Sequence, residues 1–139
     1  MNLFNRDRGA AENGAGPPAP APEEIPVLDL QVLEEMGIVP GSVPGSLPSE
    51  IIAIFLREES PRMERLAGLA SERNVPALVQ AAHNVAGSSA IIGARQTQEA
   101  AIALELAARA QAWPDVAAHL AALEAAWTRL RAALVPYQR

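Results

Sequence analysis

The chain lacks cysteine and lysine, and only 4% of its 139 residues are aromatic. Without cysteine there are no disulfide bonds, no thiol nucleophile and no zinc site with cysteine ligands. Without lysine, Schiff-base chemistry and the phosphate-binding lysine of a Walker motif are excluded, and all 11 basic residues are arginine. Two histidines are too few for a histidine-rich metal site. We therefore expect no metal site and no other cofactor.

Charge and hydropathy exclude two further classes of partner. A net charge of −5 and a pI near 5.0 argue against a nucleic-acid-binding protein. No apolar run approaches the roughly 18 residues of a membrane-spanning helix, and the first eight residues lack the apolar stretch of a secretory signal. We expect a cytoplasmic protein that binds neither nucleic acid nor membrane.

The first part of the chain, residues 1–26, has the composition of a tail. Its second half places five prolines among alanine, glycine and glutamate, at Pro17, Pro18, Pro20, Pro22 and Pro26. Such a stretch buries too little apolar surface to offset the entropy lost on ordering, and it favours extended conformations. The sequence thus predicts a disordered tail over 1–26 and one folded domain over 27–135.

Apolar residues in 27–135 recur with a helical period, and no segment alternates as a strand does. A short helix is expected over 27–36. Four longer helices are expected to start near Pro48, Asn74, Arg95 and Trp113. The apolar stripe stays in phase across Pro61, which predicts a kink rather than a break there. The predicted fold is all-α, an antiparallel four-helix bundle with a short extra N-terminal helix.

The largest apolar side chains of each helix are expected in the core. In the fourth predicted helix these are Ile102 and Leu106. In the last helix, spacings of four and three residues alternate along one stripe of Val116, Leu120, Leu123, Trp127, Leu130 and Leu134.

The third predicted helix carries an unusual outer face. When Leu78 is placed at the centre of the buried face, His83 lies about 140° away, Gly87 about 180° and Ile91 about 220°. A glycine inside a helix costs about 1 kcal/mol relative to alanine, and a solvent-facing surface has no need of isoleucine. Two interpretations follow. Either Gly87 permits another helix to pack closely and His83 is an ordinary surface residue, or Gly87 clears space beside the imidazole for a partner.

The run HNVAGSSAIIGA at 83–94 resembles the signature of histidine-containing phosphotransfer (HPt) domains. That signature is a histidine, two variable residues, usually a lysine, a run such as Gly-Ser-Ser, and a glycine after an apolar pair. Phe55, Leu56 and Pro61 are similar to the helix that precedes it in the family. The resemblance covers about 27–135. The sequence departs from the family pattern at Ala86, which occupies the position where the family usually has lysine.

The resemblance implies a phosphocarrier rather than an autonomous enzyme. His83 would accept a phosphoryl group from one receiver-domain aspartate and pass it to another, and the receiver would supply Mg²⁺ and the catalytic groups. The partners would be receiver domains of response regulators or hybrid histidine kinases, and the chain would be monomeric. The docking surface is expected around His83, with contributions from Ala86, Gly87, Ala90, Ile91 and Ala94.

The alanine at position 86 leaves alternatives open. An arginine of another helix, such as Arg57 or Arg62, would supply the missing positive charge. Alternatively, an HPt-like module docks on a receiver or a histidine kinase and regulates it without carrying phosphate. The dimerisation and phosphotransfer region of a kinase is a further alternative, although Asn84 follows the histidine where that region usually has an acidic residue. The last alternative is a structural helical bundle with no role in phosphotransfer or its regulation.

Overall fold

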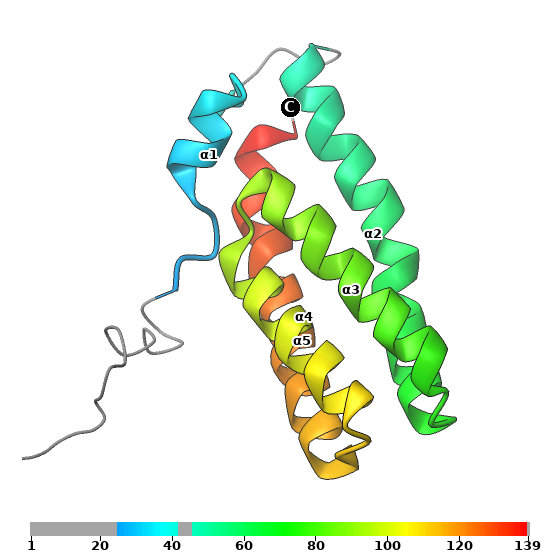
Figure 1. Ribbon diagram of the computed structural model, residues 1–139. Helices are drawn as coiled ribbons and strands as arrows, with labels where there is room; N and C mark the ends of the chain where they lie inside the picture. Colours follow the sequence, from blue (N-terminus) through cyan, green and yellow to red (C-terminus); the bar gives the residue numbers. More distant parts are fainter. Residues whose placement is uncertain (1–24, 42–45, 139) are drawn as a thin grey trace, which may run out of the picture.

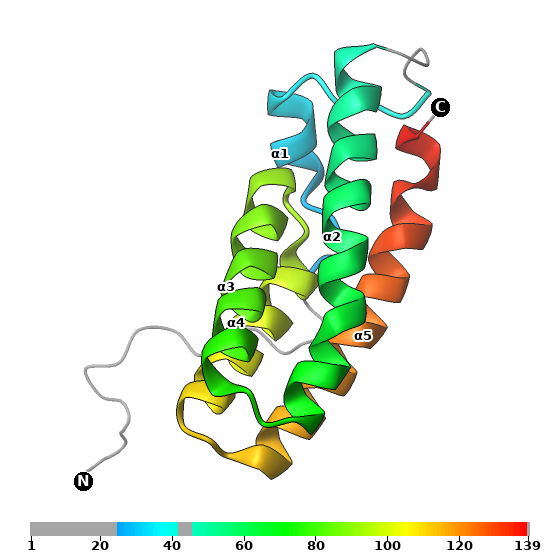
Figure 2. The same ribbon diagram turned by 90° about the vertical axis from the view of Figure 1, so that its right-hand side faces the viewer.

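The computed structural model describes residues 25–41 and 46–138. Its helices are α1 (Leu30–Glu35), α2 (Leu47–Ser71), α3 (Val75–Ile92), α4 (Arg95–Arg109), α5 (Trp113–Leu134) and a short 3₁₀ helix, η2 (Val135–Tyr137). The described residues contain no strand. The four long helices run side by side with alternating direction, and α1 lies at one end of the bundle (Figure 1, Figure 2). This confirms the predicted all-α bundle with a short N-terminal helix.

Local sequence signals set the ends of α3. The Asn74 side chain accepts a hydrogen bond from the backbone N–H of Ala77 at 3.3 Å, which caps the first turn. Gly93 ends the helix in the left-handed conformation, with φ of 77°. The neighbouring helix α2 is continuous through Pro61, as the unbroken apolar stripe predicts.

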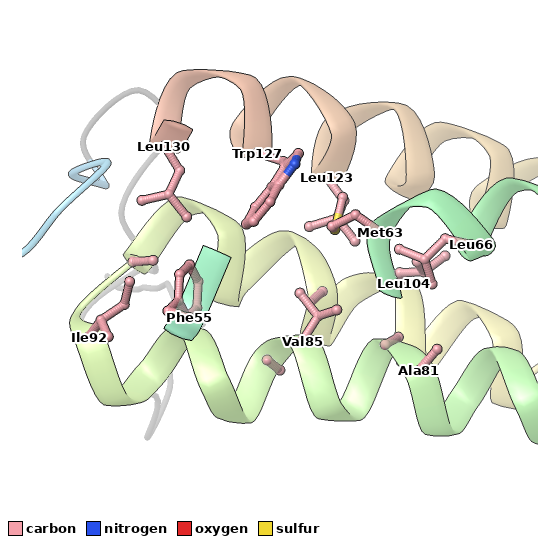
Figure 3. Close-up of a cluster of buried hydrophobic side chains, with 14 of the residues drawn as sticks. Phe55, Met63, Leu66, Ala81, Val85, Ile92, Leu104, Leu123, Trp127 and Leu130 are labelled. Carbon is pink, nitrogen blue, oxygen red and sulfur yellow. The ribbon is translucent and has the colours of Figure 1, made fainter. Parts of the chain in front are cut away.

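The core of α4 differs from the expectation. Ile102 is 36% exposed and Leu106 is 61% exposed, so the prediction that they are core residues is wrong. The buried positions of α4 are mostly small: Thr97, Ala101, Leu104, Ala107 and Ala108. Leu104 is the one large apolar side chain among these inner positions, and Ile102 and Leu106 fall on the outer face of the helix. Figure 3 shows part of the resulting core, in which Leu104 belongs to the same cluster as Leu66 and Met63 of α2.

The stripe on α5 is confirmed, with Leu120 half-buried and its other members buried. The ring of Trp127 lies 6.0 Å from that of Phe55 in α2, measured between centroids, and so joins two helices. At the other end of α5, the Arg73 guanidinium lies 5.1 Å from the centre of the half-buried Trp113 ring.

The short helix α1 is fixed to the turn between α3 and α4. The Asp29 N–H donates to the Gly93 carbonyl at 2.7 Å, and Arg95 Nη2 lies 3.2 Å from the Asp29 carboxylate. A Cβ on Gly93 would lie 2.9 Å from the Cβ of Val32, so only glycine allows this approach.

The predicted tail over 1–26 falls outside the described residues as far as position 24. Ile25 and Pro26, which the structure describes, already contact α4. The Gln96 side chain donates to the Ile25 carbonyl at 2.7 Å, and the Gln96 N–H donates to the Pro26 carbonyl at 3.2 Å. Across the described ranges, no helix combines the length and the hydropathy that crossing a bilayer requires.

Candidate functional site

His83 lies in the middle of α3 on its outer face, as the helical geometry predicts. Its side chain is 65% exposed, whereas Leu78 and Val85 on the opposite face are fully buried. The apolar inner face therefore holds the helix in place, and the imidazole remains open to solvent.

Glu105 of the neighbouring helix α4 contacts the imidazole and fixes its position. Its Nδ1 lies 3.2 Å from Oε1 of Glu105, a carboxylate that is only 14% exposed. The other carboxylate oxygen accepts from Nη2 and Nε of Arg109, at 2.7 and 3.2 Å. The site is thus a chain of three side chains, His83–Glu105–Arg109, that bridges α3 and α4.

The charge state of Glu105 decides which imidazole nitrogen is free. The hydrogen bond from Arg109 lowers the pKa of Glu105, and His83 lowers it further, against the opposing effect of burial. The group is therefore an ionised carboxylate at neutral pH, and a carboxylate only accepts hydrogen bonds. The Nδ1 atom must carry the proton in this contact. In the neutral imidazole, the unprotonated lone pair then belongs to Nε2.

Gly87 lies one turn beyond His83 and is also exposed. A Cβ built on Gly87 would meet no atom within 4 Å, so the described part of the chain packs nothing against it. This contradicts the interpretation that the glycine admits another helix of the bundle. It leaves open space beside the imidazole.

The remaining predicted docking residues separate into two groups. Ile91 is 66% exposed and Ala90 is half-buried, so both are accessible. Ala86 is only 9% exposed and Ala94 is fully buried, and their side chains cannot line an exposed surface as expected. Ala86 lies on the side of α3 that faces the core. Ala94 follows Gly93, whose left-handed conformation ends α3. The helical spacing that places residues on the outer face of α3 therefore does not extend to residue 94.

Sequence reasoning missed Glu105 and Arg109. Their spacing of four residues is typical of a surface ion pair on one helix, and that was the only signal. The sequence alone does not show which residues face His83, because this depends on how α4 packs against α3. Of the two arginines suggested in place of the family lysine, Arg62 forms an ion pair with the buried Glu59 on its own helix. The cation that the structure brings to the His83–Glu105 pair is Arg109.

Within residues 25–41 and 46–138, no three histidine or carboxylate side chains gather so as to hold a metal ion.

Comparisons with known proteins agree with the helical fold. The family model of the Hpt domain matches residues 50–133, which is more than half of the chain and includes His83 and Glu105. Among solved structures, the chain is similar to the crystal structure of a histidine-containing phosphotransfer protein from maize. The TM-score is 0.62 at 21% identity, with 76% of this chain and 78% of that chain covered, which is a likeness of fold. No curated protein matches significantly. On the strength of the family match, the chain belongs to the Hpt domain family.

Proposed function

We propose that this protein relays a phosphoryl group between receiver-domain aspartates through Nε2 of His83. The observation that carries the proposal is the contact of Nδ1 with the ionised Glu105, because it leaves Nε2 as the free nucleophile on an exposed imidazole. Membership in the Hpt family supports a phosphotransfer role.

In the proposed step, the Nε2 lone pair attacks the phosphorus atom of a receiver aspartyl phosphate. The P–N bond forms as the bond between phosphorus and the carboxylate oxygen breaks, and the aspartate leaves with that electron pair. The imidazole keeps its Nδ1 proton and becomes positively charged. Glu105 compensates this charge at 3.2 Å. The reverse step passes the group to a second receiver, and the receiver supplies Mg²⁺ in both directions.

Arg109 is our candidate for the positive charge that lysine supplies elsewhere in the family. Its guanidinium lies 2.7 Å from the carboxylate that contacts His83, and its side chain is 58% exposed. Ala86 offers no charge. We propose that Arg109 offsets the negative charge that the phosphoryl group brings next to Glu105.

The proposed docking surface lies on the outer faces of α2 and α3. It includes Gly87, Ala90 and Ile91 of α3, together with Ile54 of α2, which is 40% exposed. The two helices are antiparallel and joined by a short connection, so Ile54 and Ile91 each lie about four and a half turns from it, at a similar level. Brief encounters with receivers need only a small interface of this kind, and we propose that the protein acts as a cytoplasmic monomer.

A regulatory module that binds receivers without accepting phosphate is the second candidate function. The observation in its favour is Ala86, which leaves the position of the family lysine without charge. The exposed His83, with its Nδ1 held by Glu105, favours the relay.

A chase experiment separates these two functions. The protein is phosphorylated with labelled phosphoramidate, a small donor that requires no protein partner, and is then mixed with unphosphorylated receivers and Mg²⁺. A relay loses its label to at least one receiver within minutes, much faster than it loses label in buffer. A protein that binds receivers but keeps its label would contradict the relay.

Replacing Glu105 with alanine is expected to slow phosphoryl transfer by about tenfold or more, because the imidazole loses the partner that fixes its orientation and tautomer. Glu105→Gln keeps an oxygen that accepts from Nδ1–H and should retain most of the rate. The exposed Glu99 of the same helix provides the matched control, Glu99→Ala. Nitrogen NMR shifts of the imidazole should show proton redistribution between Nδ1 and Nε2 in Glu105→Ala alone. An unchanged tautomer and rate in Glu105→Ala would refute the positioning role.

A further inference from the structure

The outer face of α4 carries an apolar pair that the core does not use. Ile102, Glu105, Leu106 and Arg109 follow the spacing i, i+3, i+4, i+7, which places them on one face of the helix. Ile102 is 36% exposed and Leu106 is 61% exposed. We call these four residues the α4 outer face.

This face is continuous with the reacting group. Glu105, which lies at the edge of the face next to α3, contacts the His83 imidazole at 3.2 Å. Both apolar side chains therefore stand within about one helical turn, roughly 5 Å along the axis, of the residue that touches the nucleophile.

Any protein that delivers a phosphoaspartate to Nε2 must cover this neighbourhood. Even a weak, transient interface buries about 600 Å² on each partner, a patch roughly 14 Å in radius. A patch of that size around the imidazole takes in the next residues of α4. Ile102 and Leu106 would then be buried against the receiver rather than left in water.

The charge of the face also bears on the partner. Glu105 and Arg109 neutralise each other in an ion pair, and Ala86 contributes no charge where the family usually has lysine. The α4 outer face therefore combines two apolar side chains with an ion pair that adds no net charge. It fits a receiver that presents apolar side chains next to its phosphoaspartate, rather than one that relies on acidic residues there.

We infer that Ile102 and Leu106 form a second, apolar half of the receiver-docking surface, on the side of His83 opposite Ile54 and Ile91, and that they select receivers with an apolar contact at this position. The inference rests on the proposed function, because it takes the partner to be a receiver. A second copy of the chain is the competing occupant, and the test below separates the two.

The test compares Leu106→Asp with Val135→Asp. Val135 is 49% exposed and begins η2, directly after α5, so it controls for adding the same charge at another apolar surface position. Receiver binding is measured by titration and transfer by labelled phosphate across a panel of receivers. Leu106→Asp is expected to weaken binding and slow transfer by about tenfold, a typical loss for one buried apolar contact. Val135→Asp should match the wild-type chain.

Three results bear on the inference in different ways. Wild-type binding and transfer in Leu106→Asp would overturn it. The second result is that Leu106→Asp converts an oligomer of the free protein in solution to a smaller species while receiver binding is unchanged. This result would assign the face to self-association and would also overturn the inference. If the wild-type chain binds receivers but accepts no phosphate, the relay fails, while the titration with Leu106→Asp still decides the docking surface. Labelling by phosphoramidate reports separately that the His83 site is intact in each variant.

Discussion

Replacing Gly87 with leucine is expected to stabilise the bundle and at the same time to slow phosphoryl transfer from receivers by about a hundredfold. Leucine is a better helix former than glycine, which raises the free energy of unfolding by about 0.5–1 kcal/mol at a position with open space. The new side chain stands one turn from His83 and obstructs a partner that must reach Nε2.

The structure supports both halves of this expectation. Gly87 is exposed, and a Cβ at this position meets no described atom within 4 Å, so a side chain can begin there without a clash. We therefore attribute this glycine, which costs helix stability and fills no packing role, to the proposed approach of a partner from outside. Stability is measured by chemical denaturation and transfer with labelled receivers.

Gly68 provides a matched control inside the same molecule. It also lies within a long helix, α2, and is exposed, and a Cβ added to it would meet no described atom within 4 Å. Gly68→Leu should give the same gain in stability with no change in transfer. If Gly87→Leu transfers phosphate at the rate of Gly68→Leu, open space beside His83 is not required for docking.

Sequence periodicity predicted the helices well and the inner face of α4 poorly. On α5, large apolar residues recur along one stripe, and the structure buries that stripe. On α4, Ile102 and Leu106 are the conspicuous apolar residues, yet Leu104 and several alanines form the inner face. In an alanine-rich helix, small residues can be selected for close packing, so side-chain size does not identify the buried face.

The sequence predicted those features of the candidate site that depend on α3 alone. It did not predict the features that depend on the packing of α4 against α3. The outward direction of His83 and Gly87 follows from 100° per residue along α3. The same extrapolation fails at Ala94, because Gly93 ends the helix first. The partners Glu105 and Arg109 lie on α4, and only the packing of α4 against α3 brings Glu105 to the imidazole.

Replacing His83 with glutamine is expected to abolish phosphate acceptance while leaving the fold unchanged. The side chain is 65% exposed and contributes no core contact, so glutamine should alter the free energy of unfolding by less than about 0.5 kcal/mol. Glutamine has no nucleophilic ring nitrogen. Coincident unfolding curves for the two proteins would show that lost acceptance reflects lost chemistry.

The most direct measurement is phosphate transfer from a panel of labelled, phosphorylated receivers to the wild-type chain and to His83→Gln. The relay predicts label on the wild-type chain only, stable in base and lost in acid, as expected of a P–N bond on histidine. Receivers that bind the wild-type chain and never label it, or label that persists on His83→Gln, would contradict the claim that His83 carries the phosphoryl group.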